Sequence, residues 1–283
     1  MLNLAPAEQT ADDLIYATPR VVTDLRECYF YHTIDLPGYG LINGEWDLRA
    51  GIRAYLGNVD LRGKRVLEIG TANGFIGFHM EREGADVVAY DLSEEQDWDV
   101  VPFARYDHDA FRVARKAHIR KLNNAFWLGH RALQSSSRVV YGDVYSIPAA
   151  IGPVDVSTFG SILLHLRDPF LALQKALRLT RETVIVTDGW GLSDLPDHLP
   201  FYRRLLPGQL RRPAMKFLPE WEACRSRETW WRLTPELVKQ FLGVLGFERT
   251  VVSYHTQGCG SGKGRLFTVV GHRTAGGPRF DGR

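Results

Sequence analysis

Short apolar segments alternate with stretches of helical periodicity through the middle of the chain. The apolar segments are rich in branched residues and have the length of buried strands. They cover residues 64–69, 86–91, 138–143, 154–160 and 183–189, and the helical stretches cover residues 74–84, 109–135 and 168–180. Because strands that alternate with helices pair in parallel, this order predicts an α/β fold with a mainly parallel sheet and helices on both faces.

The alternation stops after Gly189, and residues 190–232 carry five prolines and four tryptophans. We interpret this segment as a cap inserted into the domain. Residues 234–247 then predict a helix, with a threonine N-cap and a proline at its first position. Segments 247–256 and 264–272 predict a final antiparallel strand pair joined by the flexible "QGCGSGKG". The pair brings the expected sheet to seven strands.

These elements suggest the domain boundaries. Residues 1–60 precede the sheet, contain an aromatic-rich segment and are expected to form an N-terminal lid on the substrate side. Residues 61–272 are expected to form the main domain, with the cap at about 190–232. The Gly- and Arg-rich residues 273–283 are expected to be a flexible tail.

Composition narrows the class of protein. Hydrophobic residues make up 45% of the sequence and charged residues 24%, which is typical of a globular protein with a sizeable core. A formal net charge of +2 is too small to indicate a nucleic-acid partner by itself. The three cysteines are far apart without a CxxC pair, so we expect no disulfide framework and no metal site. Without a signal-peptide pattern or a membrane-length apolar segment, the sequence predicts a cytoplasmic protein with no membrane partner.

A glycine-spaced loop follows the first predicted strand, in "VLEIGTANGFIGF" (residues 66–78). The loop between the first strand and its helix is the usual ligand site of an open α/β sheet. No GKS or GKT follows, which excludes phosphate-loop NTPases. A dinucleotide GxGxxG counted from Gly70 would need glycine where Ala72 and Phe75 stand, so that fit is poor.

The loop "EIGTANG" resembles the first-strand loop of class I S-adenosylmethionine-dependent methyltransferases, whose pattern is Glu-x-Gly-x-Gly-x-Gly. Glu68, Gly70 and Gly74 agree with that pattern, and Ala72 replaces the middle glycine. Alanine is still small enough to let a ligand approach the backbone closely. The resemblance implies a Rossmann-like fold and S-adenosyl-L-methionine as the cofactor.

Two carboxylates after later strands extend this match. Asp91 takes the place of the family's acidic residue at the ribose hydroxyls, and Asp143 that of the residue at the adenine amino group. A glycine loop or a strand-end Asp alone is common in ordinary turns, but their order and spacing together favour the cofactor site. The cofactor-binding set implied by the resemblance is Glu68, Gly70, Ala72, Asn73, Gly74, Asp91, Leu92, Asp143 and Val144.

Longer segments resemble a bacterial group of methyltransferase-fold proteins related to the enzymes that carboxymethylate wobble uridine in tRNA. The similar segments are "YHTIDLP", "GEWDLR", "SILLHLRDPFLAL" and "TWWRLTPELVKQFLGVLGF", within roughly residues 28–255. Those tRNA enzymes use a Lys in a "KGPF"-like segment to hold an extra carboxylate of their cofactor. The corresponding "LPGYGLINGEWDL" has no Lys, which favours ordinary methyl transfer. The resemblance does not identify the substrate.

A general base is needed only if the methyl acceptor is a hydroxyl or a protonated amine. His165 follows the fourth predicted strand and is the first candidate, because histidine titrates near neutral pH. The equal alternative is a structural histidine in the turn before Asp168, which we expect to cap the next helix. His32 is the second candidate, with packing in the lid as its alternative.

Aromatic side chains indicate where an acceptor could bind. The candidates for an aromatic substrate pocket are Tyr31, Trp46, Trp190 and Trp231. Packing within the lid and the cap is the alternative, because aromatic residues dominate buried contacts generally. We expect a small, largely apolar or aromatic substrate, plausibly from secondary metabolism.

Two other functions stay open at this point. Basic residues in "FYRRLLPGQLRRPAMK" and in residues 112–121 could follow the phosphates of tRNA, although most charge runs are solvated helix faces. The other alternative is a protein that binds S-adenosylmethionine without catalysing a reaction. The sheet edge and the aromatic N-terminal region would also allow a homodimer.

Overall fold

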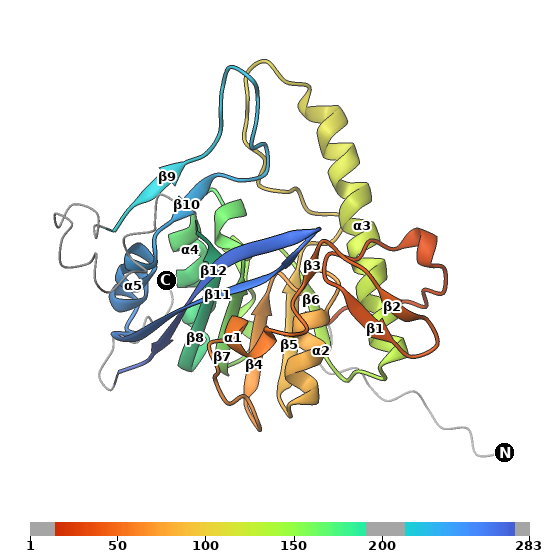
Figure 1. The fold of residues 1–283 in the computed structure, drawn as a ribbon, viewed down its shortest axis with the longest axis horizontal. Helices are drawn as coiled ribbons and strands as arrows, with labels where there is room; N and C mark the ends of the chain where they lie inside the picture. The colour runs from red at the N-terminus through yellow and green to blue at the C-terminus, as the bar shows by residue number, and fades with distance from the viewer. Residues whose placement is uncertain (1–14, 191–212, 275–283) are drawn as a thin grey trace.

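The computed structural model describes residues 15–190 and 213–274, and its centre is a curled eight-stranded sheet (Figure 1). The strand order is β3-β11-β12-β8-β7-β4-β5-β6. The parallel strands are β4 (Arg65–Ile69), β5 (Asp86–Asp91), β6 (Arg138–Tyr141), β7 (Val154–Gly160) and β8 (Thr180–Gly189). The predicted Rossmann-like α/β fold is therefore confirmed, and all five expected parallel strands are present.

Two antiparallel strands, β11 (Arg249–Cys259) and β12 (Gly262–His272), extend the sheet beyond β8. The prediction of a flexible loop at "QGCGSGKG" is wrong, because both strands run through most of it and pair with each other. Gly264 instead allows close packing, since a Cβ there would lie 2.3 Å from the Trp46 ring. Trp46 belongs to β3 (Trp46–Asp47), which pairs with the end of β11 and is an eighth strand beyond the seven predicted.

Helices cover both faces of the sheet (Figure 1). They are α1 (Ile52–Tyr55), α2 (Phe75–Arg82), α3 (His108–Ala132), α4 (Pro169–Leu177) and α5 (Pro235–Val244). Helices α4 and α5 share one buried core with the sheet, and α1, α2 and α3 share the other. Successive strand residues point to opposite faces, so Leu67 belongs to the first core and Val66 to the second.

Local sequence explains where several helices begin. Asp168 accepts a hydrogen bond from Leu171 N at 2.9 Å, and Thr234 accepts one from Leu237 N at 3.3 Å. Both are therefore N-caps, as predicted, and each is followed by a proline at the start of its helix.

Short 3₁₀ turns are η2 (Leu25–Glu27), η3 (Val144–Ser146), η4 (Ala149–Ile151) and η5 (Leu163–His165). Turns η3 and η5 stand where β6 and β7 end.

The N-terminal region packs against α2 and α3 (Figure 1). It contains a hairpin of β1 (Ile34–Leu36) and β2 (Gly40–Ile42). Ile34 and Leu36 are 4% and 1% exposed and belong to the core that α2 and α3 cover. The region is therefore attached to the main domain by buried apolar contacts.

The described part of the predicted cap contains β9 (Met215–Phe217), which pairs antiparallel with β10 (Trp231–Leu233). The chain between these strands rises above the sheet beside the loop that precedes α3 (Figure 1), and Val101 N donates to Arg227 O at 3.0 Å there. Residues 191–212 of the predicted cap and 275–283 of the predicted tail lie outside the described residues.

Gly264→Ala is expected to lower the free energy of unfolding by about 1–3 kcal/mol, because the new methyl group would displace the Trp46 ring. Urea denaturation measures this loss. Gly243→Ala is the matched control: its Cβ would meet nothing within 4 Å, and alanine favours the helix α5. An equal loss of unfolding free energy in both variants would contradict the explanation that Gly264 is needed for close packing of the Trp46 ring.

Candidate functional site

The carboxyl ends of β4, β5, β6 and β7 surround a cavity of about 450 Å³. The strand order reverses between β4 and β7, because β5 and β6 follow on one side and β8 on the other. Ligands of open α/β sheets bind at such a reversal, outside the carboxyl ends of the strands. Six predicted site residues line the cavity: Gly70, Asp91, Leu92, Asp143, Val144 and His165.

The glycine loop between β4 and α2 contains three residues in the left-handed region. Gly70, Ala72 and Gly74 have φ angles of +80°, +50° and +82°. This conformation costs alanine about 1–2 kcal/mol, whereas glycine adopts it freely. A Cβ at Gly74 would lie 2.5 Å from the Phe78 ring, so this glycine is required by helix packing. Ala72 and Gly74, both expected to contact the cofactor, do not line the cavity.

Asp91 at the end of β5 connects to the glycine loop. Its Oδ2 accepts a hydrogen bond from Ala72 N at 2.8 Å, and its Oδ1 accepts one from Leu92 N at 2.7 Å. Burial raises the pKa of Asp91, and the two amides lower it. Each carboxylate oxygen has a further lone pair, so the group can also bind a pair of neighbouring hydroxyls.

Glu68 and Asn73, also expected to contact the cofactor, lie behind the glycine loop and do not line the cavity. Glu68 is 2% exposed and accepts a hydrogen bond from Thr71 Oγ1 at 2.7 Å, and burial raises its pKa to about 8. Asn73 Oδ1 accepts from His32 N at 2.8 Å, and its Nδ2 donates to His32 O at 3.1 Å. In this arrangement Glu68 braces the loop and Asn73 fastens the N-terminal region to it.

Asp143 stands at the start of η3, on the wall of the cavity that β6 provides. Its Oδ1 accepts a hydrogen bond from Tyr145 N at 2.9 Å, and its backbone oxygen accepts one from Tyr90 Oη at 2.8 Å. No described residue donates to Asp143 Oδ2. Asp143 is thus held through both its side chain and its backbone, and one carboxylate oxygen is available to an amino group in the cavity.

His165 ends the turn η5 and lines the cavity. Its Nδ1 lies 2.6 Å from Glu228 O. A carbonyl oxygen can only accept, so Nδ1 carries the proton and Nε2 has the lone pair in the neutral ring. Burial lowers the pKa of His165, the bond to Glu228 raises it and the charge of Arg115 lowers it, with a net shift downward. His165 is therefore a neutral imidazole with an acceptor nitrogen at neutral pH.

His32, the second candidate base, is 5% exposed and does not line the cavity. Its ring packs against Tyr31 and Phe75, at centroid distances of 5.0 and 6.0 Å. Burial lowers its pKa to about 4, so the ring is uncharged at neutral pH. These contacts favour packing of the lid over proton transfer.

The four aromatic residues expected to bind substrate are not gathered in one place. Tyr31 and Trp46 are neighbours, since Trp46 N donates to Tyr31 O at 3.0 Å. Trp190 directly follows β8, and Trp231 in β10 donates from Nε1 to Arg167 O at 3.1 Å. None of the four lines the cavity that the described residues form at the strand ends.

Sequence reasoning missed one wall of the cavity, which the loop between β5 and α3 provides. Trp98 and Asp99 of this loop line the cavity. Asp99 Oδ2 accepts from Tyr145 Oη at 2.6 Å, and Asp99 O accepts from Trp230 Nε1 at 2.6 Å. The loop is polar and has no periodic pattern, so contacts from distant residues position it. Its tryptophan was the only local signal.

Asp188 near the end of β8 is a buried carboxyl that sequence reasoning did not single out, and it does not line the cavity. It is 3% exposed, and its Oδ1 accepts a hydrogen bond from Gly189 N at 2.7 Å. Burial raises its pKa to about 7. Asp188 occupies the same kind of strand-end position as Asp91, and that position is the signal that could have found it.

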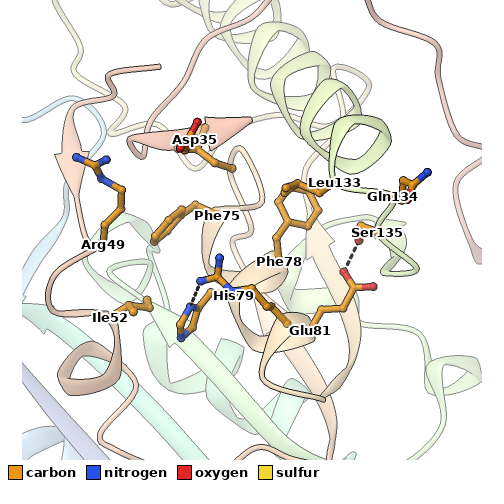
Figure 2. Close-up of a pocket in the computed structure, with 12 residues that line it drawn as sticks. Asp35, Arg49, Ile52, Phe75, Phe78, His79, Glu81, Leu133, Gln134 and Ser135 are labelled. Carbon is orange, nitrogen blue, oxygen red and sulfur yellow. Dashed lines mark hydrogen bonds between the residues drawn. The ribbon is translucent and has the colours of Figure 1, made fainter. Parts of the chain in front are cut away.

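A second cavity, of about 520 Å³, lies between β1, α2 and the end of α3 (Figure 2). Figure 2 shows Phe75 and Phe78 in it, with Arg49 on one side and Glu81 on the other. Ser135 Oγ donates to Glu81 there. None of the predicted site residues lines this cavity. The first cavity is therefore the candidate functional site.

Within residues 15–190 and 213–274, no group of three or more His, Cys, Asp and Glu side chains could hold a metal ion. No helix of these two ranges is long and apolar enough to cross a membrane. All three cysteines, Cys28, Cys224 and Cys259, are free thiols.

No protein-family model and no curated protein matches the sequence. Among solved structures, the N-terminal domain of EvdMO1, studied in the presence of SAH and D-fucose, is 19% identical with a TM-score of 0.49, and 87% of this chain and 91% of that chain are covered. Magnesium protoporphyrin IX methyltransferase from Synechocystis PCC 6803 is 13% identical with a TM-score of 0.47, covering 80% and 82%. The 1,6-didemethyltoxoflavin-N1-methyltransferase of Burkholderia thailandensis is 14% identical with a TM-score of 0.45, covering 80% and 76%. Similarity at this level carries no information on the ligands of this chain.

Asn73→Ala is expected to lower the free energy of unfolding by about 1–3 kcal/mol, because it leaves the backbone N–H and C=O of buried His32 without partners. Urea denaturation measures this change. Asn43→Ala, an exposed position of the same N-terminal region, is the control and should be close to neutral. A neutral Asn73 variant would show that the region is held without this contact.

Proposed function

We propose that this protein is an S-adenosylmethionine-dependent methyltransferase that acts on a small, largely apolar or aromatic molecule. The observation that carries the proposal is the meeting of Asp91, Asp143 and His165 with the glycine loop at one cavity. These groups follow four different strands and converge where the strand order of the sheet reverses. S-adenosylmethionine would supply the methyl group from a sulfonium, which is itself a good leaving group.

The residues present fit this cofactor. A volume of about 450 Å³ falls within the usual range of small-ligand sites. Asp91 would bind the ribose hydroxyls through the lone pairs that Ala72 and Leu92 leave open. Asp143 Oδ2 would accept from the adenine amino group, and Gly70 would let the ligand approach the end of β4.

His165 gives the site a proton acceptor. Its Nε2 lone pair can take a proton from an acceptor hydroxyl or amine during transfer, because Nδ1 already carries the ring proton. The lowered pKa keeps this nitrogen unprotonated at neutral pH. The remaining work of the chain is to align the acceptor and exclude water.

A small molecule is favoured over tRNA as the acceptor. In the basic helix α3, Arg115 pairs with Glu228 at 2.7 Å and Lys116 pairs with Asp97 at 3.6 Å, so both charges are engaged within the protein. The four arginines at positions 203, 204, 211 and 212 lie outside the described residues. A tRNA enzyme should lose affinity for RNA steeply as salt rises, whereas transfer to a small molecule should be nearly indifferent to salt.

Calorimetric titration with S-adenosylmethionine, S-adenosylhomocysteine and NAD tests the cofactor assignment. We expect the first two to bind and NAD not to bind. Asp91→Asn should weaken S-adenosylhomocysteine binding by about 10- to 100-fold, the effect of losing hydrogen bonds to a charged group. Asp60→Asn is the matched control, because Asp60 also accepts from a backbone amide, at 3.1 Å, but does not line the cavity.

Binding of NAD alone would reject the proposed function. Binding of S-adenosylmethionine that Asp91→Asn leaves unchanged would remove Asp91 from the site. Tight binding with no methylated product from metabolite or RNA pools would favour the alternative of a non-catalytic S-adenosylmethionine-binding protein.

A further inference from the structure

Residues 227–230, which we call the strap, connect the cap to the wall of the cavity. The strap hydrogen-bonds to the loop before α3, through Arg227 O to Val101 N at 3.0 Å and through Trp230 Nε1 to Asp99 O at 2.6 Å. Trp230 N also donates to Leu164 O at 2.8 Å, in the turn η5 that carries His165. The strap is therefore held against both the loop and the turn.

Glu228 of the strap makes one contact through its backbone and another through its side chain. Its backbone oxygen accepts from His165 Nδ1 at 2.6 Å, and its side-chain Oε1 pairs with Arg115 Nη1 at 2.7 Å. The side chains of Arg115 and Glu228 are only 24% and 29% exposed, so solvent screens this pair less than a surface pair. Because both contacts belong to Glu228, its ion pair with Arg115 also fixes the backbone carbonyl that His165 faces.

Aromatic rings hold the Arg115 guanidinium on its other sides. It lies 5.4 Å from the Phe111 ring centroid and 5.9 Å from the Trp98 centroid. The Trp98 ring also meets the His165 ring edge-on at 5.9 Å. Arg115 is consequently immobilised close to His165, and a fixed positive charge there disfavours a second proton on the imidazole.

Two other sets of charged groups lie near the turn η5. The carboxyl of Asp188 accepts a hydrogen bond from Gly189 N at 2.7 Å, and burial raises its pKa to about 7. Arg167 lies 3.5 Å from Asp99 and forms an ion pair with it. Burial is the main cause of the lowered pKa of His165, and Arg115 is the charged group that lowers it further, while its partner Glu228 offsets part of that charge.

We propose that Arg115 and Glu228 are positioning residues that keep His165 neutral, with its proton on Nδ1 and its Nε2 lone pair available to the acceptor. The carbonyl of Glu228 selects the tautomer, because it can only accept a hydrogen bond. The charge of Arg115 opposes the doubly protonated ring. This inference rests on the proposed function in one respect only, namely that the Nε2 lone pair takes a proton from the methyl acceptor.

Nitrogen-15 NMR of labelled histidine side chains tests the inference without a known acceptor, because two-bond correlations report both the tautomer and the pKa of each ring. The sequence has nine histidines, and the His165 signal is assigned by its loss in His165→Asn. In the wild-type protein we expect the Nδ1–H tautomer and a pKa below that of an ordinary histidine.

The variants are expected to move the pKa of His165 in opposite directions. Arg115→Gln removes the opposing cation and leaves the Glu228 carboxylate unpaired, so the pKa should rise. Glu228→Gln removes the countercharge and leaves Arg115 uncompensated, so the pKa should fall further. Arg115→Lys keeps the charge and should stay near the wild type. Arg120→Gln, an exposed position on the same helix, is the control and should change nothing.

A simple loosening of the strap would raise the pKa toward its ordinary value in both Arg115→Gln and Glu228→Gln, and that result would overturn the inference. An Nε2–H tautomer in the wild type would also overturn it. Calorimetry with S-adenosylhomocysteine on the same samples keeps the two proposals separate, because absent cofactor binding rejects the proposed function while the NMR result stands by itself.

Discussion

The hydrogen bond from the Ala72 amide to Asp91 is the contact on which the arrangement of the site depends. It joins the loop after β4 to the end of β5, and it holds Ala72 in a left-handed conformation that alanine disfavours. From the same loop, Asn73 binds both backbone groups of His32. One short loop thus lines the cavity at Gly70 and fastens the N-terminal region through Asn73.

The opposite wall of the cavity depends on polar contacts between segments that are far apart in sequence. The strap meets the loop before α3 at Asp99 and Val101, and it meets η5 at His165. A displacement of the strap would therefore reach His165 through hydrogen bonds and the Arg115–Glu228 ion pair.

The sequence motif predicted which strand ends lie together, but it did not separate residues that line the cavity from residues buried behind the loop. Asp91, Asp143 and His165 line one cavity. Glu68 and Asn73 belong to the same motif but face inward as braces, because a loop that approaches a ligand closely also needs buried partners for its own polar groups. A sequence motif contains residues that line the cavity and residues that are buried behind the loop. Only the direction in which each side chain points distinguishes the two.

The sequence by itself determined the parallel sheet, the helix caps at Asp168 and Thr234 and the glycine loop after β4, because strand periodicity, capping and left-handed turns depend on neighbouring residues. Tertiary structure alone decided the path of the loop containing Trp98, the eighth strand β3 and the tautomer of His165. Each of these depends on a partner far away along the chain. Such partners leave no local pattern, so they emerge only when the sheet brings the strand ends together.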